Sequence, residues 1–108
     1  MTNTPLSSSL QAMLATIKVD FMRTLPEHLA AFQAYLADPE LAKKQAAQQD
    51  ISMRAHRLAG VCATMGLAEM GETALQLEAV IAQRNSAETR REMVAKLVAQ
   101  IETALASE

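Results

Sequence analysis

Apolar positions recur at intervals of three and four along most of the chain, the spacing that places side chains on one face of an α-helix. Four such series are visible, and each spans three helical turns or more. They cover residues 21–36, 51–65, 70–81 and 94–105. The pattern therefore predicts four amphipathic helices, each of which buries one apolar stripe against the others.

Breaks in this periodicity predict where helices end. Ser8 and Gln11 have the spacing of a capping box, after a polar start over residues 4–9. We therefore expect a separate first helix that runs to about Val19. Pro26 lies within the apolar series of residues 21–36 and should kink or restart the helix there.

Further end signals divide the rest of the chain. Asp38 can cap a helix whose first residue is Pro39, and Gly66 is placed to end that helix. The polar stretch of residues 42–50 in between is either a frayed extension or a separate turn. Asn85 or Ser86 then offers a cap for the last helix.

The fold class expected from these features is all-α. At 108 residues the chain fits one domain, residues 1–108, and three glycines with three prolines are too few for the turns of a β-sandwich or barrel. Helices joined by short loops pack most simply as antiparallel neighbours. We expect an antiparallel four-helix bundle with an additional N-terminal helix.

Charge and composition exclude several classes of function. Ten lysines and arginines against twelve acidic residues give a net charge of −2, without the basic patch that nucleic acid requires. No apolar run approaches the roughly 20 residues of a membrane span. The single cysteine forms no internal disulfide, and the N-terminus lacks the features of a secretion signal. These observations favour a cytoplasmic protein, and the start at Met1 favours a free-standing one.

His56 lies on the outward face of its predicted helix. At about 100° per residue, it points about 140° away from the apolar stripe of residues 51–65. A solvated face normally carries long charged side chains, but the neighbours here are mostly small. They are Ser52, Met53, Ala59, Gly60 and Ala63. A glycine inside a helix costs about 1 kcal/mol relative to alanine. This face therefore favours close approach of a partner, although a lone surface histidine often has no function.

The segment AHRLAGVCATMGLAEMGETALQLE resembles the signature of histidine phosphotransfer (HPt) domains. That signature has a histidine followed by leucine, lysine and glycine, then a second glycine and a Leu-Glu pair in the next helix. The matching residues are His56, Leu58, Gly60, Gly66, Leu77 and Glu78, and the resemblance covers roughly residues 21–108. It implies a four-helix bundle and a phosphocarrier in a two-component phosphorelay, rather than an autonomous kinase.

The resemblance also implies roles and partners. His56 would be the phosphoacceptor, response-regulator receiver domains and a hybrid sensor histidine kinase would be the partners, and the outward face would dock the receiver. This chain would bind no cofactor or metal, because the receiver supplies Mg²⁺. Glu78 either orients the imidazole ring or is a plain surface carboxylate.

One departure from the signature concerns charge. The family lysine three residues after the histidine is Ala59 here. Arg57, about 100° round the helix from His56, either replaces that charge at the phosphoryl group or is an ordinary solvated arginine.

Other functional hypotheses remain beside the phosphocarrier. A helical adaptor would bind a receiver or kinase through the same face without being phosphorylated, and the missing lysine supports it. A dimer would cover the small-residue face, whereas the carrier is expected to be a monomer.

The remaining chemically active side chains are expected to be structural. His28 is predicted to be a solvated histidine, and two histidines without ligand spacing make no zinc site. Cys62 and the methionines at 65, 70 and 93 are expected to fill the core, whereas Met53 is expected to contact a partner.

Overall fold

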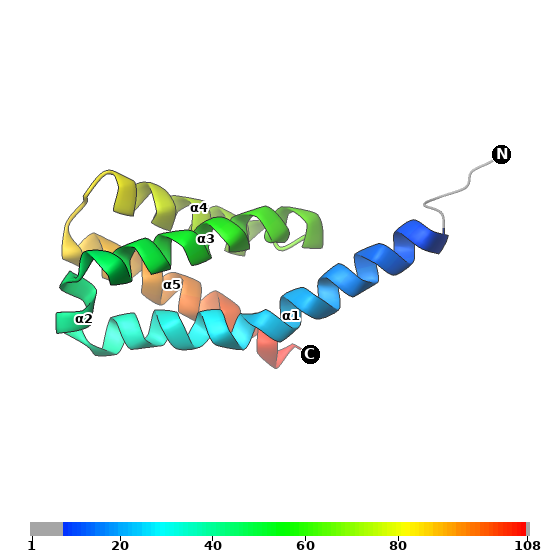
Figure 1. The fold of residues 1–108 in the computed structure, drawn as a ribbon, viewed down its shortest axis with the longest axis horizontal. Helices are drawn as coiled ribbons and strands as arrows, with labels where there is room; N and C mark the ends of the chain where they lie inside the picture. The colour runs from blue at the N-terminus through cyan, green and yellow to red at the C-terminus, as the bar shows by residue number, and fades with distance from the viewer. Residues whose placement is uncertain (1–7, 108) are drawn as a thin grey trace.

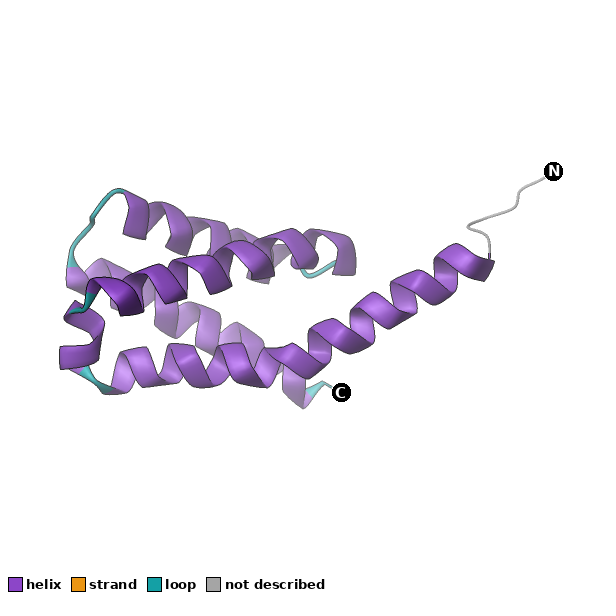
Figure 2. Cartoon of the chain, in the orientation of Figure 1, coloured by secondary structure: helices purple, strands orange, loops and turns teal. Residues whose placement is uncertain are grey.

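Residues 8–107 are described by a computed structural model, and helices account for nearly all of them. Figure 1 shows the arrangement, and Figure 2 shows how short the connecting loops are. No strand occurs within the described residues, so the predicted all-α class is confirmed. The helices are α1 (Ser8–Ala37), α2 (Pro39–Lys43), α3 (Gln45–Met65), α4 (Ala68–Ala82) and α5 (Ala87–Ala106).

Four long helices form the predicted antiparallel bundle. The chain runs up α1, back along α3, up α4 and back along α5, while the short helix α2 connects α1 to α3 at one end (Figure 1). Helix α3 packs along α4, α5 contacts both α4 and α1, and α1 contacts α3, which closes the bundle. The four-helix bundle expected from the apolar periodicity is therefore confirmed.

The N-terminal helix is not a separate element. Helix α1 runs without interruption from Ser8 to Ala37, so the predicted end near Val19 is wrong. Of the kink or restart predicted at Pro26, no restart occurs. No proline or glycine stands near Val19 to stop the helix. The loss of apolar periodicity there reflects absence of packing, because none of residues 8–20 is buried and this part projects beyond the bundle (Figure 1).

The proline inside α1 is accommodated by a bend. Pro26 has no N–H to donate within the helix, which favours bending. Figure 1 shows that the axis of α1 changes direction in its middle part. Ser8 is already helical, so it is not the cap that the Ser8 and Gln11 spacing predicted, and most of the predicted polar start lies outside the described residues.

The other helix ends follow the predicted chemistry. A side-chain oxygen of Asp38 accepts hydrogen bonds from the backbone N–H groups of Glu40 and Leu41, at 3.0 and 3.2 Å. Ser86, rather than Asn85, caps α5 by accepting from the N–H of Thr89 at 3.1 Å. Lys44 separates α2 from α3, so the single helix predicted from Pro39 to Gly66 is divided in two. Within the polar stretch of residues 42–50, residues 42 and 43 end the short helix and residues 45–50 begin α3.

The core is formed by the four predicted stripes. Side chains from α1, α3, α4 and α5 meet in one apolar cluster, in which Cys62 and Met70 are buried and Met65 and Met93 pack at its edge. The expectation that these residues fill the core is confirmed. The largest side chains that are fully enclosed are Tyr35, Phe32, Leu25, Ile51, Leu58 and Leu77.

Candidate functional site

His56 is exposed on α3 and is held by a carboxylate from α4. The side chain is 74% exposed, and its Nδ1 lies 3.0 Å from Oε2 of Glu78. Because a carboxylate only accepts, this contact favours the tautomer in which Nδ1–H donates to Glu78. The lone pair then resides on Nε2, so Nε2 is the available nucleophilic nitrogen.

The antiparallel packing of α3 and α4 brings these two residues together across 22 positions of sequence. Of the two readings of Glu78, the geometry therefore favours a carboxylate that orients the ring over a plain surface carboxylate. Its side chain is 32% exposed, which places it at the edge of the seam between the two helices.

A cleft of about 530 Å³ runs beside His56 between α3 and the end of α4; we call it the His56 cleft. It is lined by α3 side chains from Gln45 to His56, and by Glu78, Ile81, Ala82 and Arg84. Glutamines provide neutral hydrogen-bonding groups at the end away from His56. The charged side chains in the lining are Glu78 and Arg84, and the lining also includes the imidazole of His56.

The small-residue face is exposed next to this cleft. Gly60 and Ala63 are exposed, and the large apolar side chain of Met53 is 49% exposed. Met53 and Ser52 line the His56 cleft. A Cβ added at Gly60 would meet no atom of residues 8–107 within 4 Å, so none of these residues requires glycine there.

Ala59 belongs to this face, and Arg57 lies about 100° round the helix from His56. Ala59 is partly buried against the core, and its carbonyl is 3.8 Å from where a Cβ on Gly71 of α4 would lie. Arg57 is exposed and does not line the His56 cleft. Its positive charge contributes to the lowered pKa of His28. Its role as the replacement for the family lysine stays a prediction.

His28 was predicted to be solvated, and that prediction is wrong. It lies on the buried face of α1, 8% exposed, with Nδ1 3.0 Å from Nη1 of Arg54. Arg54 also bonds Oδ2 of Asp50 through Nε at 2.9 Å. Burial lowers the pKa of His28, and the charges of Arg54 and Arg57 lower it further. His28 therefore joins α1 to α3 as a neutral acceptor for Arg54, away from the His56 cleft.

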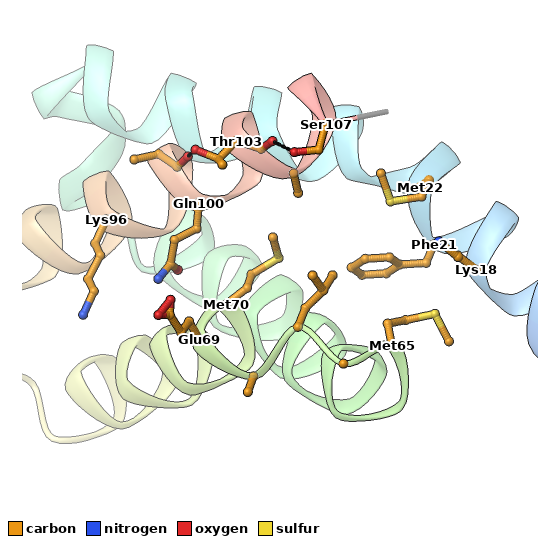
Figure 3. A pocket seen from close by; sticks show the side chains of 15 residues that line it. Lys18, Phe21, Met22, Met65, Glu69, Met70, Lys96, Gln100, Thr103 and Ser107 are labelled. Atoms are coloured by element: carbon orange, nitrogen blue, oxygen red, sulfur yellow. Dashed lines mark hydrogen bonds between the residues drawn. The ribbon is translucent and has the colours of Figure 1, made fainter.

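A larger hollow than the His56 cleft lies elsewhere in the described part of the chain. It measures about 790 Å³ and lies at the other end of the bundle, between α1, α5 and the loop from α3 to α4 (Figure 3). Phe21, Met22, Met65 and Met70 give it an apolar wall, and Lys18 and Lys96 lie at its edge. It contains neither His56 nor Glu78, so we do not assign the candidate chemistry to it.

Metal binding, membrane insertion and thiol chemistry have no support in the described part of the chain. No cluster of histidine, cysteine and acidic side chains there is suited to hold a metal ion. None of the described helices combines the length and apolarity needed to cross a membrane. Cys62 is fully buried, and burial raises the pKa of its thiol to about 11, so it is inert rather than nucleophilic.

Comparison with known proteins identifies the family. The model of the Hpt domain family matches residues 16–107, which is most of the chain. No curated protein and no solved structure matches it. The chain belongs to the Hpt domain family, whose members take part in histidine phosphotransfer in phosphorelays, as the signature around His56 indicated.

Proposed function

We propose that this chain is a phosphocarrier in which His56 accepts a phosphoryl group from the aspartyl phosphate of one receiver domain and passes it to another. The observation that carries the proposal is the pairing of an exposed imidazole with Glu78 at 3.0 Å. Membership of the Hpt family supports the reaction class. A hybrid sensor histidine kinase would be the ultimate donor, in the cytoplasm.

The transfer needs little from this chain beyond the nucleophile. The lone pair on Nε2 of His56 attacks the phosphorus, the N–P bond forms, and the P–O bond to the receiver's aspartate breaks as that carboxylate leaves with the electron pair. The ring keeps its Nδ1–H and gains positive charge, which the adjacent Glu78 carboxylate stabilises. The receiver would supply Mg²⁺, since phosphoryl transfer depends mainly on positioning and charge.

Glu78 is the positioning residue in this scheme. Replacing it with alanine removes the acceptor at Nδ1 and lets both tautomers and more ring orientations compete. Because the His56 side of the pair is largely exposed to solvent, the contribution of the pair is about 0.5–1 kcal/mol, so we expect a two- to fivefold slower transfer. Glu78→Gln keeps an acceptor and should retain most of the rate if it acts by orientation, but not if the full negative charge is required.

The first experiment tests for the phosphohistidine itself. The chain is incubated with phosphorylated receiver domains and Mg²⁺, beside a His56→Gln variant, and intact mass is measured after acid and after alkali. A phosphoryl group that is acid-labile, alkali-stable and absent from the variant supports the carrier. Label on both proteins would contradict the assignment to His56.

The adaptor is the other outcome of this experiment. Binding of a phosphorylated receiver without label on His56 would favour it, and the alanine at position 59 is the feature of the chain that supports it. If label is found, Arg57→Ala tests whether Arg57 replaces the missing lysine. Slower loading by every receiver is expected if it does, and an unchanged rate if Arg57 is merely solvated.

A further inference from the structure

Arg84 occupies a backbone conformation that does not suit an arginine. Its φ is +56°, and it is the one residue other than glycine that has a positive φ among residues 8–107. It lies just past the end of α4, where the N–H of Asn85 bonds the carbonyl of Val80 at 3.1 Å and that of Arg84 bonds Ile81. This arrangement is a Schellman motif, which favours glycine at the left-handed position.

Helix α3 ends in the same way but with the expected residue. The N–H of Leu67 bonds the carbonyl of Cys62 at 3.0 Å, and the residue in the left-handed conformation is Gly66, with φ +75°. A side chain in this conformation carries a cost that glycine avoids. The arginine at the end of α4 therefore occupies a position where the backbone conformation favours glycine.

The guanidinium of Arg84 is available to a partner. Arg84 lines the His56 cleft, and within residues 8–107 no ion pair or hydrogen bond engages its side chain. The one carboxylate in that lining, Glu78, is bonded to His56. The cleft therefore presents a positive charge that none of the described residues neutralises.

Its position indicates contact with a docked protein rather than with the phosphoryl group. Arg84 follows Glu78 by six residues and lies just past the end of α4, where it lines the cleft. A receiver that brings its phosphorylated aspartate to His56 also brings the carboxylates that hold Mg²⁺, so its approaching face is acidic. The chain as a whole has a net charge of −2, so attraction must come from local positive groups.

We propose that Arg84 is a docking residue that pairs with an acidic side chain of the receiver domain seated over His56. This inference rests on the proposed function and adds the residue that recognises the partner. In this proposal Arg84 increases the affinity for the receiver, whereas Arg57 is the candidate for stabilising the negative charge of the phosphoryl group.

The test uses the receiver that labels the wild-type chain, with transfer measured at increasing receiver concentration and at low and high salt. For Arg84→Asn, which is neutral and tolerates the left-handed conformation, we expect KM to rise roughly two- to fivefold at low salt with kcat unchanged. The difference should shrink in about 1 M salt, where charges are screened within roughly 3 Å. Arg84→Lys should recover most of the affinity.

Two controls separate recognition from folding. Arg84→Gly should melt at or above the wild-type temperature because it removes the strained side chain, yet show the same rise in KM. Arg23, which lies on α1 and pairs with Asp20, is a matched arginine away from the cleft, and Arg23→Gln should transfer like wild type.

The outcomes are distinguishable from those of the proposed function. If KM and its salt dependence are the same in Arg84→Asn and wild type, or if only kcat falls, the docking role is refuted while phosphotransfer stands. If no receiver labels the wild-type chain on His56, the proposed function fails and this inference fails with it.

Discussion

Two glycines of this chain should respond in opposite ways to the same substitution. Gly60 lies inside α3 with no atom within 4 Å of an added Cβ, whereas a Cβ on Gly71 of α4 would lie 3.0 Å from the Cβ of Cys62. Alanine in a helix is favoured over glycine by about 0.8–1 kcal/mol. Gly60→Ala should therefore be more stable by this amount, because the added methyl group clashes with none of the described residues.

Gly71→Ala has the same intrinsic gain but must also displace Cys62. Inserting a methyl group into a packed seam costs about 1–3 kcal/mol. The net change therefore ranges from roughly zero to a loss of about 2 kcal/mol. With a melting temperature that shifts by about 4–8 °C per kcal/mol in a domain of this size, Gly60→Ala should melt higher than wild type and Gly71→Ala the same or lower.

The measurement is urea and thermal unfolding of both variants, followed by helical circular dichroism. The slope of the unfolding free energy against urea concentration should be the same in the variants and the wild type. A shift in the urea midpoint then reports a change in stability and not a change in the unfolded chain. A Gly60→Ala variant that melts no higher than wild type would contradict the reasoning, because it would mean that the added methyl group meets a neighbouring atom. Equal gains for both variants would show that the α3 and α4 seam yields without cost.

Three other substitutions or conditions test the remaining features. The pKa of His28 is lowered in the fold, so the unfolded chain, in which this pKa has its ordinary value near 6.5, binds a proton that the folded chain does not. The free energy of unfolding should therefore fall as the pH drops below about 6.5. In thermal melts at several pH values, His28→Gln should lose this part of the pH dependence. Cys62, fully buried, should react with a thiol reagent roughly a hundredfold or more slower in the folded protein than in urea; a fast native reaction would contradict its burial. Ser86→Ala should lose about 1 kcal/mol by removing the cap of α5, seen as a lower urea midpoint, and Ser86→Asp should keep it.

Periodicity predicted the bundle well because each long helix buries one stripe. The same pattern, followed further, would have corrected the prediction for His28. Phe21, Leu25, Phe32 and Tyr35 are all buried on α1, and their spacing leaves a gap that His28 fills. A histidine at such a position is enclosed whatever its polarity, and Arg54 from α3 then supplies its hydrogen bond.

The end of the N-terminal segment near Val19 was predicted from a signal that has two meanings. Loss of apolar periodicity marks either the end of a helix or a helix that leaves its neighbours, and only a proline, glycine or capping residue distinguishes the two. Helix α1 continues past Val19 and leaves its neighbours over residues 8–20. The conformation of Arg84 had no signal in the sequence at all, because a left-handed arginine is not expected from composition or spacing.

The His56 cleft depends on how closely α3 and α4 approach. Gly71 lies seven residues before Glu78, so both face α3 from the same side of α4. The missing side chain at Gly71 lets the two helices meet at Cys62, and this contact sets the separation at which Glu78 reaches His56. The residue that fixes the seam therefore also fixes the orientation of the nucleophile. Transfer by Gly71→Ala should then fall toward the rate of Glu78→Ala, even at temperatures where the variant is fully folded.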